Sequence, residues 1–286
     1  MGAEGSDRPS LCVKIWKYEF PEPSMCRLLG YLGIPTTLDT LLYKPEHSLI
    51  AQSYQPREMT AGLLNADGFG LGWYHPHRSV EPFTYKNTLP IWNDSNLLSL
   101  SRYVESGSVL ANVRSATPGL AVDLGNCQPF QHQFMLGVHN GFIENFRQTL
   151  YRPIRNQLSD VAYQAIHGNT DSEHIFALVI DQLVRSPTLT LTEALTEAIA
   201  CLSHLGKTHQ TEFSANIILS DGKQLVASRF ASRDPVPTLY WLRDDPTLPN
   251  AVLIASEPFF AGNWHPFGDR SILTIDHDLN FTTHTL

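Results

Sequence analysis

The order of strand-like and helix-like segments is the feature that most constrains the fold of this chain. Alternating apolar patterns predict strands at 26–34, 69–75, 82–87, 108–114, 132–139, 214–220, 223–231, 240–243, 251–256, 272–275 and 281–284. Helical spacing of apolar residues is expected over 94–105, 157–166, 171–185 and 190–205. Asp221-Gly222 predicts a tight hairpin turn. Strands towards both ends, with helices between them, predict an α+β fold of layered antiparallel sheets.

Composition excludes several classes of function. The 286 residues contain 20 Lys and Arg against 28 Asp and Glu, a net charge of -8, which argues against a nucleic-acid or anionic membrane surface. No apolar run reaches about 18 residues, so a membrane span is not expected. The four cysteines form no CxxC pair, which argues against structural zinc and a disulfide framework and favours a cytoplasmic location.

The pair Met25-Cys26 has the form of a chain start, although 24 residues precede it. A cysteine at position one carries a thiol and a free α-amine on the same residue, and that amine can serve as base for its own nucleophile. We therefore divide the chain into a leader, residues 1–25, and one domain, residues 26–286. The leader is either an upstream start assigned in error, a propeptide or a permanent extension, and the first is favoured. It contains charged residues and no apolar core, so it does not resemble a secretory signal.

Two polar clusters follow apolar strands and allow a plain and a catalytic interpretation. In the run 112–117, Arg114 ends a strand, where it forms either a structural ion pair or a two-pronged clamp for a carboxylate. In the run 137–141, Asn140-Gly141 forms either an ordinary hairpin turn or an oxyanion hole, made by an Asn amide and a neighbouring backbone N–H.

Two further clusters are equally open to both interpretations. The run 168–173, which contains Asp171, precedes a strong helix. It is either an ordinary N-cap segment, or Asp171 accepts hydrogen bonds from a substrate ammonium group. In the run 65–73, the alternate glycines Gly68, Gly70 and Gly72 allow close approach of another backbone or a ligand. A phosphate loop is poorly supported there, because neither a lysine nor a helix follows.

Six motifs in one order carry a family resemblance. They are Cys-Arg-Leu-Leu-Gly from Cys26, Asp-Gly-x-Gly-x-Gly from Asp67, Arg-x-Ala-Thr from Arg114, Asn-x-x-Pro-Phe from Asn126, His-Asn-Gly-x-Ile from His139 and Thr-Asp-Ser-Glu from Thr170. Together they resemble the class II glutamine amidotransferases, which are N-terminal-nucleophile hydrolases with a four-layer αββα sandwich. The resemblance implies Cys26 as nucleophile, Asn140 and Gly141 as oxyanion hole, Arg114 and Thr117 as binders of a glutamyl carboxylate, and Asp171 as acceptor for its ammonium group.

The resemblance also implies an activity. Because the glutaminase-like unit uses nearly all residues after Cys26, the chain resembles the stand-alone branch that includes the ergothioneine-pathway amidohydrolase. We expect a hydrolase that cleaves a γ-glutamyl amide, such as a γ-glutamyl hercynylcysteine sulfoxide, with no metal or cofactor and no partner beyond a possible second copy. The alternatives are a glutaminase subunit that delivers ammonia to a separate synthetase and a non-catalytic glutamyl-binding module. Pro118 and Gln128 stand where many members have His, so we expect the far side of the substrate pocket to differ.

Overall fold

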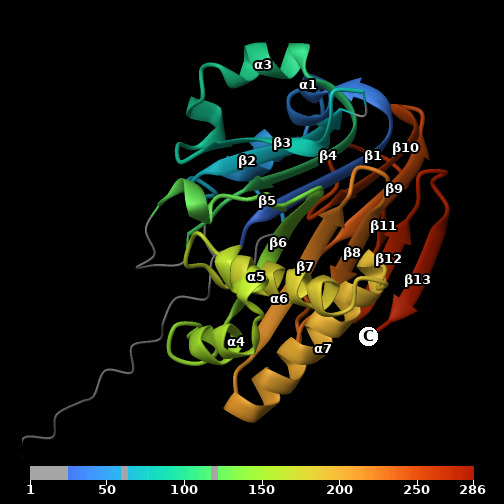
Figure 1. Cartoon of the computed structure of the whole chain (residues 1–286). Helices are drawn as coiled ribbons and strands as arrows, with labels where there is room; N and C mark the ends of the chain where they lie inside the picture. Colours follow the sequence, from blue (N-terminus) through green and yellow to red (C-terminus); the bar gives the residue numbers. More distant parts are fainter. Residues whose placement is uncertain (1–24, 59–63, 76, 117–121) are drawn as a thin grey trace, which may run out of the picture.

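Two antiparallel β-sheets lie face to face, and helices cover the outer side of each (Figure 1). The structure is a computed structural model that describes residues 25–58, 64–75, 77–116 and 122–286. The order of layers is therefore helices, sheet, sheet, helices. This is the α+β, four-layer αββα arrangement predicted from the sequence.

The first sheet has seven strands in the order β11-β9-β10-β1-β4-β2-β3. They are β1 (Arg27–Thr37), β2 (Phe69–His75), β3 (Ser79–Asn87), β4 (Glu105–Val113), β9 (Tyr240–Asp245), β10 (Leu248–Ala255) and β11 (His265–Pro266). Its outer side is covered by α1 (Leu38–Leu42), α2 (Leu49–Tyr54) and α3 (Leu97–Tyr103).

The second sheet has six strands in the order β13-β12-β8-β7-β6-β5. They are β5 (Phe130–His132), β6 (Met135–Ile143), β7 (Phe213–Ser220), β8 (Leu225–Arg229), β12 (Ser271–Ile275) and β13 (Phe281–Thr285). Its outer helices are α4 (Tyr151–Gln157), α5 (Asp160–Gln164), α6 (Asp171–Arg185) and α7 (Leu191–His209). Two short 3-10 turns, Ile91–Asn93 and Leu124–Asn126, complete the described elements.

Strand β1 shows why the sheets stack in this way. Successive side chains of a strand point to opposite faces. Leu28 and Leu32 lie in the core between the two sheets, whereas Leu29 and Tyr31 lie in the core under α1 to α3. A strand that is buried on both faces is mostly apolar. The first six residues of β1 are all buried, and Arg27 is the one charged residue among them.

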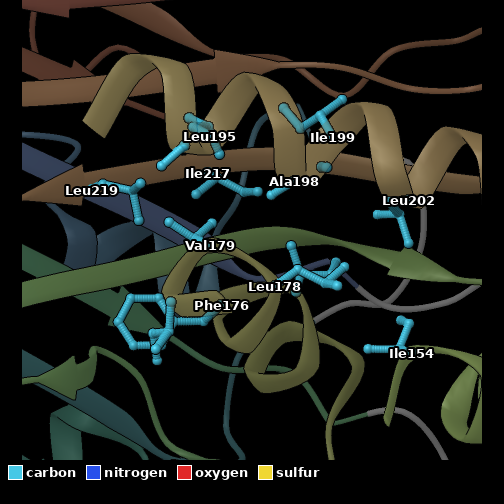
Figure 2. Close-up of a cluster of buried hydrophobic side chains, with 14 of the residues drawn as sticks. Ile154, Phe176, Leu178, Val179, Leu195, Ala198, Ile199, Leu202, Ile217 and Leu219 are labelled. Carbon is cyan, nitrogen blue, oxygen red and sulfur yellow. The ribbon is translucent and has the colours of Figure 1, made fainter. Parts of the chain in front are cut away.

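Helices α6 and α7 form the other outer layer by packing on β7. Figure 2 shows Val179 of α6 and Leu195 and Ala198 of α7 beside Ile217 and Leu219 of β7. All five side chains are buried. Apolar residues at i, i+3 and i+4 give each helix the continuous apolar face that this packing requires.

The alternate glycines of the run 65–73 are needed for close backbone approach. A Cβ atom on Gly70 would lie 2.1 Å from the carbonyl oxygen of Gln128, and one on Gly68 would lie 2.7 Å from the sulfur of Cys127. Gly68 also has a positive φ of 105°, which side chains disfavour. The segment before β5 therefore crosses over β2 with no room for side chains, which favours the backbone interpretation of these glycines.

The structure confirms several predicted elements and corrects others. The helix predicted over 171–185 matches α6. Asp221-Gly222 lies in the predicted hairpin between β7 and β8, but the connection is the four residues 221–224 rather than two, because Ser220 pairs with Leu225. The expected turn at Asn140-Gly141 is wrong, because both residues lie inside β6, which begins and ends later than predicted. The helix predicted over 157–166 corresponds to α5, which is shorter than predicted, because Gln157 still belongs to α4 and α5 runs only from Asp160 to Gln164. Among the described residues, no helix is long and apolar enough to cross a bilayer.

Candidate active site

Cys26 and Arg114 lie at neighbouring ends of two paired strands. Strands β1 and β4 are antiparallel, with Arg27 opposite Val113. Cys26 immediately precedes β1 and Arg114 immediately follows β4. An antiparallel pair brings the start of one strand beside the end of the other, so two motifs that are 88 positions apart in the sequence become neighbours.

The alternation of strand residues directs the side chains of both motifs towards the second sheet. Leu28 of β1 and Leu110 of β4 lie in the core between the sheets, and Cys26 and Arg114 continue the same alternation beyond the strand ends. Asn140 occupies the matching face of the second sheet, because it is two residues beyond Val138, which lies in the same core. The predicted nucleophile, cation and oxyanion donor therefore lie on the facing sides of the two sheets.

The surroundings of the Cys26 sulfur disfavour the thiolate. Its sulfur lies 3.9 Å from the carbonyl oxygen of Ser115. Burial raises the pKa of the Cys26 thiol, whereas a backbone hydrogen bond with Ser115 and the charge of Arg114 lower that pKa, and the charge of Asp171 raises it. The balance is a raised pKa, so a base is needed to generate the nucleophilic thiolate. Because the charges of Arg114 and Asp171 both change the pKa of the thiol, both side chains lie close enough to interact electrostatically with the sulfur.

Arg114 is a buried cation with an available donor. The side chain is 3% exposed, and its Nη1 donates to the carbonyl oxygen of Asp67 over 3.2 Å. Its Nη2 is buried and has no hydrogen-bond partner among the described residues. Within that part of the chain Arg114 forms no ion pair, which argues against the structural ion pair considered from the sequence. A buried unpaired guanidinium is costly, and a substrate carboxylate would satisfy it.

Asp171 is the first residue of α6 and faces β6. The helix begins at the N-cap Thr170, whose hydroxyl accepts a hydrogen bond from the backbone N–H of Glu173, so the predicted cap is confirmed. The two carboxylate oxygens of Asp171 accept from the backbone N–H groups of Ile143 and Ser172, each over 2.8 Å. Each oxygen keeps a lone pair with which to accept from an ammonium group.

Gly141 owes its identity at least partly to packing. A Cβ atom at this position would lie 2.1 Å from the carbonyl oxygen of Ser214 and 2.5 Å from Nε2 of His139. Asn140, which is 1% exposed, has an Oδ1 without a hydrogen-bond partner among the described residues. The pair therefore sits in a tightly packed strand, and its backbone is held in one position, as an oxyanion hole requires.

Gln128 has a different role from the one expected. Its side chain is 2% exposed, its Nε2 donates to the carbonyl oxygen of His139, and its Oε1 accepts from the N–H of the same residue. Gln128 is thus a structural link to β6, and the expectation that the far side of the pocket differs stays a prediction. Pro118 and the predicted carboxylate binder Thr117 lie outside the described residues.

A buried ion-pair cluster of Arg27, Glu257 and His47, which no sequence motif indicates, lies next to the nucleophile. Arg27 donates through Nη1 to the carbonyl oxygen of Cys26 over 3.0 Å and through Nε to Glu257 over 2.8 Å. The other carboxylate oxygen of Glu257 accepts from Nε2 of His47 over 2.7 Å. Both side chains of the Arg27–Glu257 pair are 1% exposed. The cluster fixes the backbone next to the thiol.

The described residues offer one group that could hold a metal ion. Potential ligand atoms of Asp276, His277 and Asp278 lie within 4.8 Å of one another at the turn between β12 and β13. The carboxylate of Asp276 already accepts from the N–H groups of Asp278 and Asn280. These bonds are those of an ordinary acidic turn, so the cluster gives no reason to propose a metal centre.

Comparison with known proteins identifies the family. The sequence profile of the class II glutamine amidotransferases matches residues 25–253. The probable glutamine amidotransferase DUG3 of Saccharomyces cerevisiae is 30% identical over 88% of this chain and 82% of its own length. The gamma-glutamyl-hercynylcysteine sulfoxide hydrolase of Mycolicibacterium smegmatis is 29% identical over 88% of this chain and 96% of its own.

Solved structures share the fold. A glutamine aminotransferase class-II domain protein from Silicibacter pomeroyi superposes with a TM-score of 0.66 at 24% identity, over 91% of this chain and 99% of its own. The glutamine phosphoribosylpyrophosphate amidotransferase from B. subtilis superposes with a TM-score of 0.62 at 18% identity, over 91% of this chain and 49% of its own. The chain therefore belongs to the class II glutamine amidotransferases and is an enzyme that hydrolyses carbon–nitrogen bonds.

Proposed function

We propose that this chain hydrolyses a γ-glutamyl amide through a thioester on Cys26, with Cys26 as the first residue of the active form. The observation that carries this proposal is the buried guanidinium of Arg114, whose Nη2 has no partner among the described residues, within electrostatic range of the Cys26 sulfur. A glutamyl group presents a carboxylate, an ammonium group and an amide carbonyl. Arg114, Asp171 and the pair Asn140-Gly141 match these three groups in turn.

The reaction is acyl transfer in two steps. The α-amine of Cys26 takes the thiol proton, and the thiolate attacks the γ-carbonyl carbon, forming a carbon–sulfur bond. The developing oxyanion is stabilised by the Asn140 amide and the backbone N–H of Gly141. The carbon–nitrogen bond then breaks, the leaving amine takes the proton, and water hydrolyses the thioester to glutamate and free thiol. These steps need no metal or cofactor.

The free α-amine requires that residues 1–25 be absent from the active chain. Met25 is 7% exposed and directly precedes Cys26, so its removal would free the nitrogen of Cys26. We favour Met25 as the true initiator, because a small second residue such as Cys suits removal of the methionine. The catalytic domain is then residues 26–286.

For the substrate, we propose a γ-glutamyl hercynylcysteine sulfoxide, with a role in ergothioneine biosynthesis. Support comes from the similarity along nearly the full length of the mycobacterial-type hydrolases, of which this chain covers 93% to 96%. A cytoplasmic location fits a chain with unpaired thiols at Cys26, Cys127 and Cys201. The similarity to a relative named only as a probable glutamine amidotransferase keeps the ammonia-donor function as the second candidate.

Steady-state hydrolysis by protein that begins at Cys26 tests the proposal. Purified alone, it should release glutamate from γ-glutamyl thio-compounds faster than from glutamine, whereas Cys26→Ser should be inactive. Cys201→Ser, which changes a half-buried thiol on α7, is the matched control and should keep the parent rate. Activity with glutamine alone, and only in the presence of a synthetase, would favour the ammonia-donor function. Binding without turnover would favour the non-catalytic module.

A further inference from the structure

The ring of His139 has no role in the mechanism above, yet it is fixed from both sides. It is 3% exposed, with Nδ1 2.9 Å from Oγ of Ser172 and Nε2 3.1 Å from the carbonyl oxygen of Ser214. A carbonyl oxygen only accepts, so Nε2 carries the proton and Nδ1 is an acceptor. The Ser172 hydroxyl has two acceptors within reach, Nδ1 of His139 at 2.9 Å and Oδ1 of Asp171 at 3.3 Å, and its single proton goes to the nearer one, Nδ1. His139 therefore bridges α6 and β7 as a neutral ring.

Helix α6 holds β6 at two points on either side of the oxyanion residues. Ser172 bonds the side chain of His139, and Asp171 bonds the backbone N–H of Ile143 over 2.8 Å. Asn140 and Gly141 lie between these two points. The first residue of the helix is also the proposed acceptor of the substrate ammonium, so one rigid element contacts the substrate and holds the oxyanion hole.

The packing around the ring leaves this segment of β6 little freedom. A Cβ atom on Gly141 would lie only 2.5 Å from Nε2 of His139. The backbone N–H and carbonyl of His139 are both bonded to the carboxamide of Gln128. A shift of the α6 N-terminus that keeps this hydrogen bond must therefore move the ring, and the ring contacts the backbone of Gly141.

We propose that His139 is a positioning residue that couples recognition of the substrate ammonium at Asp171 to the geometry of the oxyanion hole through Ser172. The inference rests on the proposed γ-glutamyl hydrolysis. With the link intact, the ammonium of the substrate contributes to turnover as well as to binding, since remote binding interactions can raise kcat when they orient the reacting groups. With the link broken, the same ammonium contributes to binding alone.

Two chromogenic substrates separate these effects. γ-Glutamyl-p-nitroanilide carries the α-ammonium, and glutaryl-p-nitroanilide lacks it. In protein that begins at Cys26, the first should exceed the second in kcat by about 10-fold or more, from the strength of a hydrogen bond to a charged group. The ratio of the two kcat values reports the coupling, and the ratio of the two KM values reports binding.

Two substitutions of His139 test the hydrogen bond between its ring and Ser172. His139→Gln retains a donor for Ser214 and loses the acceptor for Ser172, so its kcat ratio should fall towards one while its KM ratio stays at the parent value. His139→Asn retains an acceptor for Ser172 and should keep most of the kcat ratio. Ser172→Ala should behave like His139→Gln. Ser228→Ala is the matched control, because it removes a buried hydroxyl whose one hydrogen bond within the described ranges goes to a β7 carbonyl, that of Ala215.

The outcomes distinguish the inference from the proposed function. If the parent cleaves γ-glutamyl-p-nitroanilide and both His139→Gln and Ser172→Ala keep the parent kcat ratio, the coupling is refuted. An equal loss of kcat with the two substrates in both variants would also overturn it, because His139 would then be merely structural. If the parent cleaves neither substrate, the proposed function fails and the coupling fails with it.

Discussion

Replacing Glu257 by Gln should destabilise the protein far more than the loss of an ordinary surface charge. The carboxylate accepts from the side chains of Arg27 and His47 and from the backbone N–H groups of Arg57 and Glu58, over 2.7 to 3.0 Å. Glutamine keeps the shape of the side chain but places an amide N–H where an acceptor is needed, and it leaves Arg27 buried without a counter-charge.

The magnitude follows from the pKa and from the burial. Burial opposes ionisation of Glu257, yet the hydrogen bond from His47 and the charge of Arg27 outweigh it and lower its pKa from 4.5 to about 2. A pKa lowered by that much corresponds to about 3 kcal/mol of stability at neutral pH. Breaking a buried ion pair by removing one partner typically costs about 3–5 kcal/mol. We therefore expect Glu257→Gln to lose about 3 kcal/mol or more.

The lowered pKa of Glu257 also sets how the stability of the protein depends on pH. The folded pKa is lower than the unfolded value, so the contribution of Glu257 is fully present above about pH 4.5 and is lost as the pH falls towards 2. The difference in stability between parent and Glu257→Gln should therefore be large at pH 7 and shrink across this window.

Urea denaturation at pH 7 and at several acidic pH values measures both effects. Asp269→Asn is the control, since Asp269 pairs with Arg229 but its side chain is 58% exposed; it should cost no more than about 1 kcal/mol. A loss below about 1 kcal/mol for Glu257→Gln at pH 7, or a difference from the parent that does not change down to pH 2, would refute the reasoning.

Three further changes test the site. Cys26→Ser should lower kcat by about two orders of magnitude or more without changing the unfolding midpoint, and comparable rates would refute the nucleophile assignment. Arg114→Ala should raise KM about 10- to 100-fold through loss of a charge-assisted clamp, and a changed kcat at constant KM would make Arg114 structural. Gln128→Leu should lower stability by about 1–3 kcal/mol, since it leaves the buried backbone groups of His139 unpaired; an unchanged midpoint in urea would contradict this.

Elements with a strong local pattern could be predicted from the sequence. Helix α6 has an N-cap at Thr170 and apolar residues at helical spacing, and both signals are local. The hairpin at Asp221-Gly222 depends on one residue with positive φ, for which glycine is the usual choice. Paired strand ends then bring the predicted residues Cys26 and Arg114 together.

Other features depend on contacts that no local pattern encodes. Asn140-Gly141 has the composition of a turn, yet pairing with β7 keeps it extended, and close packing against Ser214 explains the glycine. The structural role of Gln128 could not be predicted, because its side chain bonds the backbone of His139, and such a bond leaves no signal in the sequence. Arg27 and Glu257 are 230 positions apart, so nothing in the sequence near either residue indicates that they pair.

The central claim, that Cys26 acts with its own free α-amine, is tested most directly by mass spectrometry of the active chain. Protein purified from its natural source is treated with an electrophilic glutamine analogue, 6-diazo-5-oxo-L-norleucine, until activity is lost, and the labelled chain is digested and sequenced. The account predicts a chain that begins at Cys26, with a free amino group and the label on that sulfur. A fully active chain in which the nitrogen of Cys26 is still joined to Met25 would contradict it.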